Sequence, residues 1–215
     1  MVKRILTDYQ RSKQDNNDDT LFYNNPRLVH HLDLGFRTRL TQLYNDVIKE
    51  DSVLLDLMSS WVSHLPKDLK LKEVIGHGLN NHELKTNTRL TRFWIQNLNI
   101  SQILPLGDNT IDICTIVAGW QYLQEPEAIC SELKRVVKPK GKLIVSFSDR
   151  AFWSKSPRIW VDNSNQNRLK YISSILLNEE WVVSKTFSEK TFNKGWMNIF
   201  PREGDPFFSI IATNN

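Results

Sequence analysis

The chain is poor in cysteine, because its 215 residues include only Cys114 and Cys130. Two isolated cysteines give neither a disulfide framework nor the spacing of a cysteine-rich metal site, so we expect both to be reduced thiols in the core. All five histidines lie within the first 82 residues, and their spacing matches no metal-binding motif. The sequence therefore predicts a protein without a bound metal.

Long apolar segments are missing as well. Residues 1–6 are basic but lead into a polar stretch at 10–20, so we expect neither a signal peptide nor a membrane span. This pattern favours a cytoplasmic protein with no membrane partner. Charge of one sign is not in excess either, since 28 Lys and Arg stand among 24 Asp and Glu. The formal charge of +4, spread along the chain, indicates a solvated surface, and nucleic acid is not an expected partner.

The chain does contain enough apolar residues, 40%, to bury one core, and we expect a single domain over residues 21–215. Residues 1–20 offer little apolar surface, so we expect this segment to be loosely ordered. Asn25 and Pro26 are typical of a helix start. An N-terminal helical cap is therefore predicted before the first strand, with an apolar face made of Phe36, Leu40, Leu43, Tyr44 and Val47.

The segment 104–147 predicts a strand, a helix and a second strand. Its parts are an apolar strand at 113–117 that stops at Ala118 and Gly119, a helix from Pro126, a turn at 138–141 and a strand at 143–147. Because a connection of this length is too long for a hairpin, we expect the two strands to be parallel and joined by a right-handed crossover.

Strands and helices continue to alternate through most of the chain, which predicts an α/β fold. The other expected elements are strands at 52–57, 72–76 and 93–95, a short helix at 61–65, a helix containing Leu84 and Leu90, a helix near 168–177, and strands at 181–183 and 207–212. The last two strands have no helix between them but a long polar connection with Trp196 and Met197, so we expect them to be antiparallel.

The order of these elements resembles the class I S-adenosylmethionine-dependent methyltransferase fold over about residues 23–213. More narrowly, five segments are similar to an uncharacterised methyltransferase-like family of cyanobacteria, other bacteria and plants: FYNNPRLVHHLD (22–33), LLDLMSSWVSHLP (54–66), GHGLNNHELKTN (76–87), IQNLN (95–99) and SFSDRAFWSKSPRIW (146–160). The resemblance implies a Rossmann-like, doubly wound, mostly parallel seven-stranded sheet with a C-terminal antiparallel strand pair.

The resemblance also implies S-adenosyl-L-methionine as the cofactor, bound where the parallel strands end. The implied cofactor-binding residues are Asp56, Met58, Ser59, Ser60 and Trp61 at the methionine part, Asn80 at the ribose, Asn97 and Leu98 at the adenine, and Ala118 and Gly119 beside the methyl group. Tyr23, Arg27, His31 and Trp120 are the candidates to face the substrate. No residue stands out as a catalytic base, and the catalytic residues stay unassigned.

Two positions depart from the superfamily pattern. Met58, Ser60 and Val62 stand where a glycine-rich turn is expected, and Gly78 stands where an acid normally follows the second strand. These departures leave two hypotheses open. One is a methyltransferase acting on an unidentified small molecule. The other is a catalytically degenerate binding or assembly protein, whose crevice the side chains of Met58 and Trp61 would fill.

Two further functions are not expected. Residues 205–208, Asp-Pro-Phe-Phe, resemble a signature of amino-group methyltransferases that act on nucleic acid, but they stand far from the strand after which that signature occurs. A nicotinamide-dependent oxidoreductase is disfavoured because the sequence lacks the glycine-rich GxGxxG motif.

Overall fold

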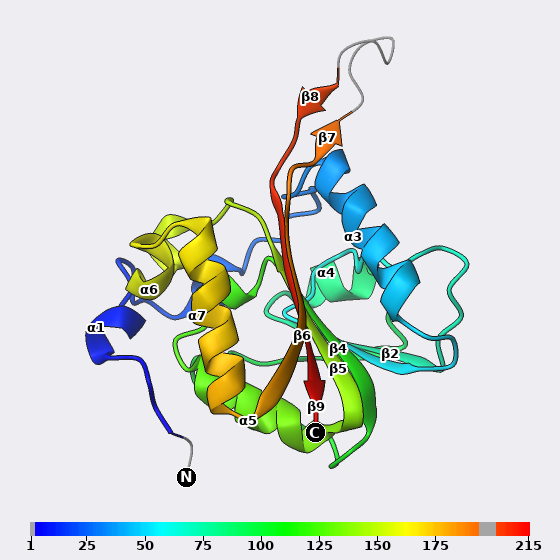
Figure 1. The fold of residues 1–215 in the computed structure, drawn as a ribbon, viewed down its shortest axis with the longest axis horizontal. Helices are drawn as coiled ribbons and strands as arrows, with labels where there is room; N and C mark the ends of the chain where they lie inside the picture. Colours follow the sequence, from blue (N-terminus) through cyan, green and yellow to red (C-terminus); the bar gives the residue numbers. More distant parts are fainter. Residues whose placement is uncertain (1–2, 194–200) are drawn as a thin grey trace.

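The computed structural model describes residues 3–193 and 201–215 and has a sheet of seven strands at its centre (Figure 1). The strands are β1 (Val53–Leu57), β2 (Glu73–Gly78), β3 (Arg92–Ile95), β4 (Ile111–Val117), β5 (Val137–Phe147), β6 (Trp181–Glu189) and β9 (Phe207–Asn214). Their order in the sheet is β3, β2, β1, β4, β5, β9, β6. The first five are parallel, and β9 lies antiparallel between β5 and β6. The predicted sheet and its C-terminal antiparallel pair are confirmed.

Helices cover both faces of this sheet. Figure 1 shows α3 (Leu34–Val47) and α4 (Asn81–Thr86) on one side, and α5 (Pro126–Val136) and α7 (Asn165–Asn178) on the other. Shorter elements are α1 (Asp8–Arg11), α2 (Asp19–Phe22), α6 (Arg158–Val161), the 3-10 turns η1 (Trp120–Tyr122) and η2 (Trp153–Lys155), and a second, two-stranded sheet of β7 (Phe192–Asn193) and β8 (Arg202–Glu203).

The core has two halves because side chains alternate across the strands. On one face, Phe36 of α3 packs in a buried cluster with Ile144 of β5, whereas the next residue, Val145, joins the opposite cluster with Leu133 of α5 and Ile172 of α7. Cys114 and Cys130 are buried free thiols, as expected. Within the described ranges, no helix has the length and apolar character needed to cross a membrane.

The N-terminal segment differs from the expectation of loose order. Arg11 is only 4% exposed, and its Nη2 donates to Oε1 of Glu127 in α5 at 2.6 Å. The same carboxylate accepts the backbone N–H groups of Ile5 and Leu6. Buried ion pairs therefore fix a segment that has too few apolar residues to pack by hydrophobic contact alone.

Four local predictions are wrong. The helix predicted to contain Leu84 and Leu90 is α4, which ends at Thr86, so Leu90 lies outside it. No helix begins at Pro26, because Asp33 supplies the cap of α3, its Oδ1 accepting the N–H of Phe36 at 2.9 Å. Residues 61–65 are not helical, and the indole of Trp61 instead donates to the Val29 carbonyl. The predicted turn at 138–141 lies within β5, which begins with Val137 paired to Ile111 and then shifts register. The connection with Trp196 and Met197 lies outside the described residues.

Candidate functional site

A cavity of about 710 Å³ lies at the carboxyl ends of β1, β2, β3 and β4. Its lining includes Met58 after β1, Gly78 at the end of β2, Asn97 after β3 and Ala118 after β4. This volume is within the range of about 300–1,000 Å³ that is typical of small-molecule sites. The expected convergence of four strand ends on one hollow is confirmed. Met58 and Trp61 line this opening, so the filled crevice that the degenerate alternative predicted is not found.

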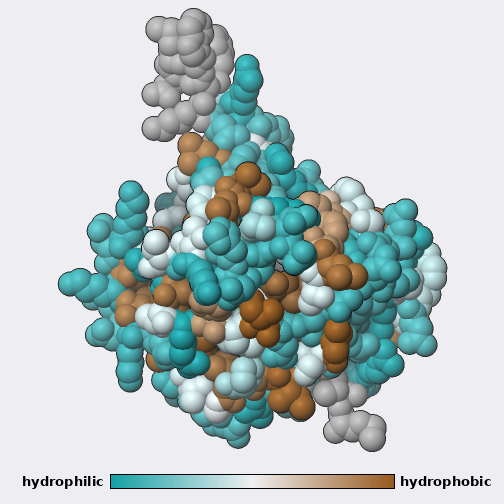
Figure 2. All heavy atoms as spheres, turned by 180° about the vertical axis from the view of Figure 1, so that it is seen from behind, coloured by the Kyte–Doolittle hydropathy of each residue, from teal (hydrophilic) through white to brown (hydrophobic). Residues whose placement is uncertain are grey.

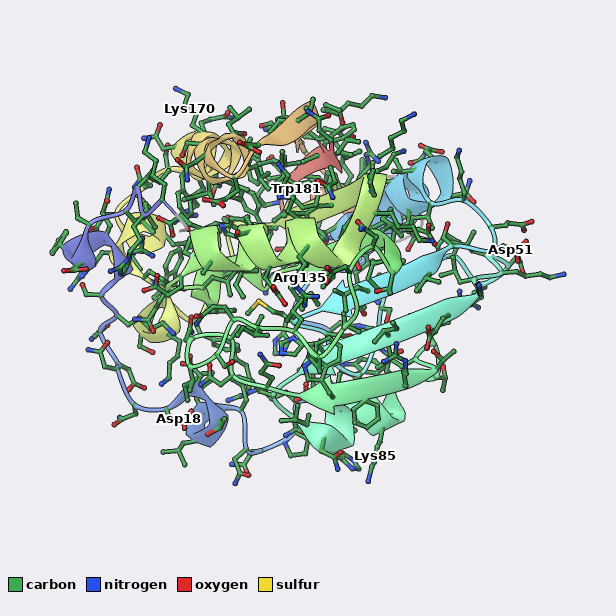
Figure 3. The ribbon with its side chains drawn as sticks, turned by 90° about the horizontal axis from the view of Figure 1, so that it is seen from below. Asp18, Asp51, Lys85, Arg135, Lys170 and Trp181 are labelled. Atoms are coloured by element: carbon green, nitrogen blue, oxygen red, sulfur yellow. The ribbon has the colours of Figure 1, made fainter. Side chains whose placement is uncertain are left out.

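Residues 13–33, here called the cap segment, close this edge of the sheet. Figure 3 shows Asp18, in the cap segment, and Asp51, before β1, at opposite ends of the strands. The cap segment is tied down by Asn97, whose Nδ2 donates to Asp18 Oδ1 at 2.9 Å, and by Asn80, whose Nδ2 donates to the Tyr23 carbonyl at 2.8 Å. Figure 2 views the molecule from behind relative to Figure 1, and on this face hydrophobic residues are exposed among hydrophilic ones.

Every predicted site residue except Trp120 lines the cavity. The set is Tyr23, Arg27, His31, Asp56, Met58, Ser59, Ser60, Trp61, Asn80, Asn97, Leu98, Ala118 and Gly119. The predicted binding roles require these residues to lie around one cavity, and they do. The roles themselves stay predictions.

The prediction for Trp120 is wrong. Its side chain is 1% exposed and belongs to the buried cluster with α5 and α7. Trp120 opens the 3-10 turn η1, and the residues of that turn that line the cavity are Gln121 and Tyr122. The sequence shows two aromatic residues here, Trp120 and Tyr122, but does not decide which ring points into the cavity and which into the core.

The turn after β1 lacks the expected glycines, and a hydrogen bond to a histidine ring holds it instead. Met58 has a φ of 59°, in the left-handed region that a side chain normally disfavours. The N–H of Met58 donates to Nδ1 of His77 at 3.1 Å, and Nε2 of the same ring lies 2.9 Å from the Gln96 carbonyl. Nε2 therefore carries the proton, and the neutral ring ties the turn after β1 to the loop after β3. His77 was not among the predicted site residues.

The burial of His77 predicts a pH-dependent stability. Burial lowers the pKa of His77 from 6.5 to about 4. The unfolded ring takes up a proton below pH 6.5 and the folded ring does not, so the free energy of unfolding should fall by about 3 kcal/mol between pH 6.5 and 4 through this group. His77→Asn keeps an acceptor near the position of Nδ1 but does not titrate. Urea unfolding across this range should give a flatter profile for His77→Asn than for the wild type.

The control for this measurement is His82→Asn. His82 is an exposed residue of α4. This residue lies outside the buried contact between the turn after β1 and the loop after β3, so the slope of stability against pH should stay as in the wild type. Equal slopes for His77→Asn and the wild type would contradict the role given to the buried ring.

Asp56 is a buried carboxyl group at the base of the cavity. It is 3% exposed and accepts hydrogen bonds from Ser59 Oγ at 2.6 Å and Thr115 Oγ1 at 3.3 Å. Burial outweighs these hydrogen bonds and raises the pKa of Asp56 to about 6. It is thus ionised at pH 7 and holds the turn after β1 through Ser59. No helix follows β1 directly, so the Asp56 carboxyl group does not act as a helix cap.

A glycine is needed at position 78 because the backbone at the end of β2 comes very close to the backbone of the turn after β1. A Cβ built on Gly78 would lie 2.6 Å from the Ser59 carbonyl oxygen, in the turn after β1. The acid that the superfamily pattern expects here therefore has no room. Another carboxylate lines the cavity nearby: Glu83 of α4 accepts from Ser60 Oγ at 2.6 Å and from the Arg27 N–H at 2.7 Å. Glu83 was not predicted, because a Glu in the first turn of a helix looks like an ordinary N-terminal charge.

Asn80 and Asn97 use their side chains on the protein itself. Asn80 caps α4 through Oδ1 and donates through Nδ2 to the carbonyls of the cap segment. Asn97 donates to Asp18, and its Oδ1 accepts the N–H of Asn99 at 3.0 Å. Each amide therefore shapes the cavity wall, and a ligand would meet only the hydrogen-bonding capacity that is left, the second N–H of Asn97 included, or adjoining backbone.

Aromatic rings and a guanidinium group form another part of the cavity wall. The Arg27 guanidinium lies 4.6 Å from the Phe22 ring centroid and 5.4 Å from that of Phe152. His31 meets Phe152 edge to face, and burial together with the charge of Arg27 lowers the pKa of His31, so this imidazole is neutral at pH 7. Phe152 follows β5, lines the cavity and was not among the predicted site residues. Within the described residues, no group of His, Cys, Asp and Glu side chains forms a metal site.

Comparisons with known proteins agree with this geometry. Residues 58–145 match the family model described as "Methyltransferase domain". A demethylmenaquinone methyltransferase of Streptomyces avermitilis is 23% identical over 109 residues, which cover 45% of this chain and 46% of that protein. The chain thus matches less than half the length of its curated relatives.

Solved structures share the fold at low sequence identity. A SAM-dependent methyltransferase from Aquifex aeolicus is 18% identical with a TM-score of 0.58, covering 92% of this chain and 97% of its own. The methyltransferase in a complex with the Haloferax volcanii Trm112 methyltransferase activator is 12% identical with a TM-score of 0.62, covering 84% and 89%. The chain thus shares the fold of S-adenosylmethionine-dependent methyltransferases, and residues 58–145 match a methyltransferase domain, which indicates S-adenosylmethionine as the cofactor.

Proposed function

We propose that the protein transfers a methyl group from S-adenosylmethionine to a small molecule. The observation that carries this proposal is the cavity itself. It lies at the carboxyl ends of four parallel strands of a methyltransferase fold. Ligands of open α/β sheets bind in this place, at the point where the strand order reverses. Here the reversal falls between β1 and β4, and both strands end at the cavity.

The residues present fit the proposed cofactor. S-adenosylmethionine carries an ammonium group, a sulfonium cation and a nucleoside, and the cavity offers the carboxylates of Asp56 and Glu83 and the turn after β1 at Ser59. In this arrangement the turn after β1 holds the methionine part, the end of β2 the ribose, and residues 97–98 the adenine. Gly119 borders the methyl group, since a Cβ there would lie 2.8 Å from Met58 Cβ and narrow the cavity.

The chain's contribution to the reaction is alignment and exclusion of water. S-adenosylmethionine supplies an activated methyl group when bound, and the acceptor atom must meet it in line. The cap segment covers the strand ends with Tyr23, while Tyr122 and Phe152 form an apolar wall next to them. A covered, largely apolar chamber holds two reactants in place and keeps hydrolytic water out.

The enclosure also supports a small acceptor. The cap segment contributes Tyr23, Arg27 and His31 to the cavity wall, and the formal charge of +4 is spread over the chain. The Streptomyces relative is named for methylating demethylmenaquinone, which is a small molecule. Both observations support an acceptor of that size.

Calorimetric titration with S-adenosyl-L-homocysteine, the product form of the cofactor, tests the first half of this proposal. We expect a Kd of roughly 1 μM to 1 mM, in the usual range for enzyme ligands. Absence of heat at millimolar ligand would end the proposal. Gly119→Val should abolish the heat because the added side chain meets Met58, while the protein keeps its cooperative unfolding.

Label transfer tests the second half. Incubation of the protein with methyl-labelled S-adenosylmethionine and a cell extract, fractionated by size, should place label in the small-molecule fraction. Label in protein or nucleic acid would contradict the proposed acceptor class. Cofactor binding with no transfer to any fraction would favour the degenerate binding protein, which Met58 in the turn after β1 first suggested.

A further inference from the structure

One cation of the cavity wall has no anion paired with it. Arg27, in the cap segment, and Arg150, after β5, are the arginines that the described residues place in this wall. The charge of Arg150 is paired, because its Nε donates to Oδ1 of Asp205 at 2.6 Å. Among the residues that the structure describes, the Arg27 guanidinium has no carboxylate partner, and it donates only to the Phe22 carbonyl, through Nη2 at 3.0 Å. An anionic ligand can therefore pair with Arg27.

Three aromatic rings hold the Arg27 side chain in place. Its guanidinium carbon lies 4.6 Å from the ring centroid of Phe22, 5.5 Å from that of Tyr23 and 5.4 Å from that of Phe152. Contacts between a guanidinium and aromatic rings are attractive, and they leave the N–H groups in the guanidinium plane able to donate. The cation is thus positioned before a ligand binds.

Part of this guanidinium is accessible from the cavity. Arg27 is half-buried and lines the cavity. Its Nη1 is buried without a hydrogen-bond partner, whereas Nε, which has no partner among the described residues either, is not one of the buried atoms. The Nε–H group is therefore a donor that a ligand can meet.

The acidic side chains beside Arg27 are engaged with other groups. Glu83 accepts the backbone N–H of Arg27 through Oε1 and the Ser60 hydroxyl through Oε2. Asp19 pairs with Lys13. These carboxylates are held by their own donors, so they do not neutralise the guanidinium.

The surroundings of Arg27 indicate which reactant it meets. Phe152 follows β5, and Tyr23 packs edge to face with Tyr122 in η1, after β4. The guanidinium thus lies beside the ends of β4 and β5. The proposed contacts of the cofactor lie at the ends of β1, β2 and β3, with its methyl group next to Gly119 after β4. An acceptor that meets this methyl group therefore has Arg27 within its own part of the cavity.

We propose that the methyl acceptor is a small organic acid whose carboxylate or phosphate group pairs with Arg27. This inference rests on the proposed function. The planar guanidinium matches the oxygens of either anion. Phe152 and Tyr122, whose rings stack at 6.1 Å, offer an apolar surface to the rest of the acid.

The methyl group goes to another atom of the acceptor, so the product keeps its anionic group. That atom forms the new bond to the methyl carbon with its lone pair. The carbon–sulfur bond breaks with its electron pair left on sulfur, and a proton on the accepting atom passes to water.

Anion exchange of the labelled product tests the inference. The wild-type protein is incubated with methyl-labelled S-adenosylmethionine and the small-molecule fraction of a cell extract, and the products are passed over a strongly basic resin at neutral pH. We expect the label that exceeds a reaction without protein to be retained. Treatment of the retained product with alkaline phosphatase distinguishes the two anions, because it releases the label only from a phosphate.

Two failures are distinguishable in this experiment. Transferred label that passes through the resin would overturn the inference and leave the proposed function standing. Absence of any transfer would overturn the proposed function itself.

Two variants locate the recognition on Arg27. Arg27→Met removes the charge and keeps an apolar side chain among the rings. The initial rate of transfer at dilute extract should fall at least about tenfold, as expected for the loss of a hydrogen bond to a charged group. The affinity for S-adenosyl-L-homocysteine should stay within about twofold of the wild type.

The matched control is Arg92→Met. Arg92 begins β3, at the end of the strand away from the cavity, and pairs with Glu73 with its side chain 52% exposed. This variant should transfer label at the wild-type rate. Transfer by Arg27→Met at the wild-type rate would overturn the inference. Weaker binding of S-adenosyl-L-homocysteine by Arg27→Met would also overturn it, because Arg27 would then hold the cofactor's own carboxylate. Retention of the wild-type product remains decisive if Arg27→Met fails to fold.

Discussion

Gly78→Asp, which restores the acid that the superfamily pattern expects after β2, should lower the affinity for S-adenosyl-L-homocysteine by more than about tenfold, or about 1.4 kcal/mol. The reason is space. Any Cβ at position 78 lies 2.6 Å from the Ser59 carbonyl oxygen, a backbone atom that cannot rotate away. The turn after β1 must then move, and this turn carries Met58 and Ser59 into the cavity. Overpacking of this kind also costs roughly 1–3 kcal/mol of stability.

Gly107→Asp is the matched control for this prediction. Gly107 lies in an exposed turn before β4, and its added Cβ would meet only Thr110 Cγ2, at 3.2 Å. The same carboxylate there should leave the affinity within about twofold and the stability within about 0.5 kcal/mol of the wild type. If Gly78→Asp binds the ligand as well as the wild type does, the close approach of the two backbones is not what excludes the acid.

Arg11→Met should lower the free energy of unfolding by roughly 3–5 kcal/mol at pH 7, because it leaves the buried Glu127 without its cation. Glu127 is 1% exposed and would retain only the N–H groups of Ile5 and Leu6. Burial by itself raises the pKa of Glu127, but the hydrogen bonds from Arg11 and from backbone N–H groups together outweigh it and lower the pKa. The stabilisation is thus present above the unfolded pKa of about 4.5 and is lost as the pH falls through the lower folded value.

The control is Arg4→Met, which breaks an ion pair of the same kind at the surface. Arg4 Nη2 lies 3.0 Å from Glu125 Oε1, and its side chain is 54% exposed. Such pairs contribute about 0–1 kcal/mol. Chemical denaturation of both variants at pH 7 measures the difference. A similar loss of unfolding free energy in the two variants would show that burial of the Arg11–Glu127 pair is not what holds residues 3–20 against the rest of the protein.

The sheet could be predicted from the sequence because each strand has its own apolar run and turn signals. The run at 113–117 and the helix from Pro126 are local patterns, and the structure places β4 and α5 there. The common location of Met58, Asn97 and Ala118 follows from the parallel order alone, since the carboxyl ends of parallel strands meet at one edge.

The rest depends on contacts between residues far apart in the chain. The Arg11–Glu127 ion pair joins residues 116 positions apart, and no local sequence pattern predicts it. The loosely ordered segment was expected on composition, and composition counts apolar surface but not buried ion pairs. Trp120 was misplaced because a tryptophan beside a strand end has the same pattern whether its ring turns into the core or into a cavity.

The position of β9 has a consequence for how the chain acquires its shape. β9 is inserted between β5 and β6, and among the described strands of this sheet it is the only partner of β6. During synthesis, β5 and β6 therefore each expose an unsatisfied edge until residues 207–214 emerge from the ribosome. Pairings between distant segments form slowly. Assembly of the sheet should thus wait for its last-made strand, and the nascent protein needs protection from edge-to-edge association until then.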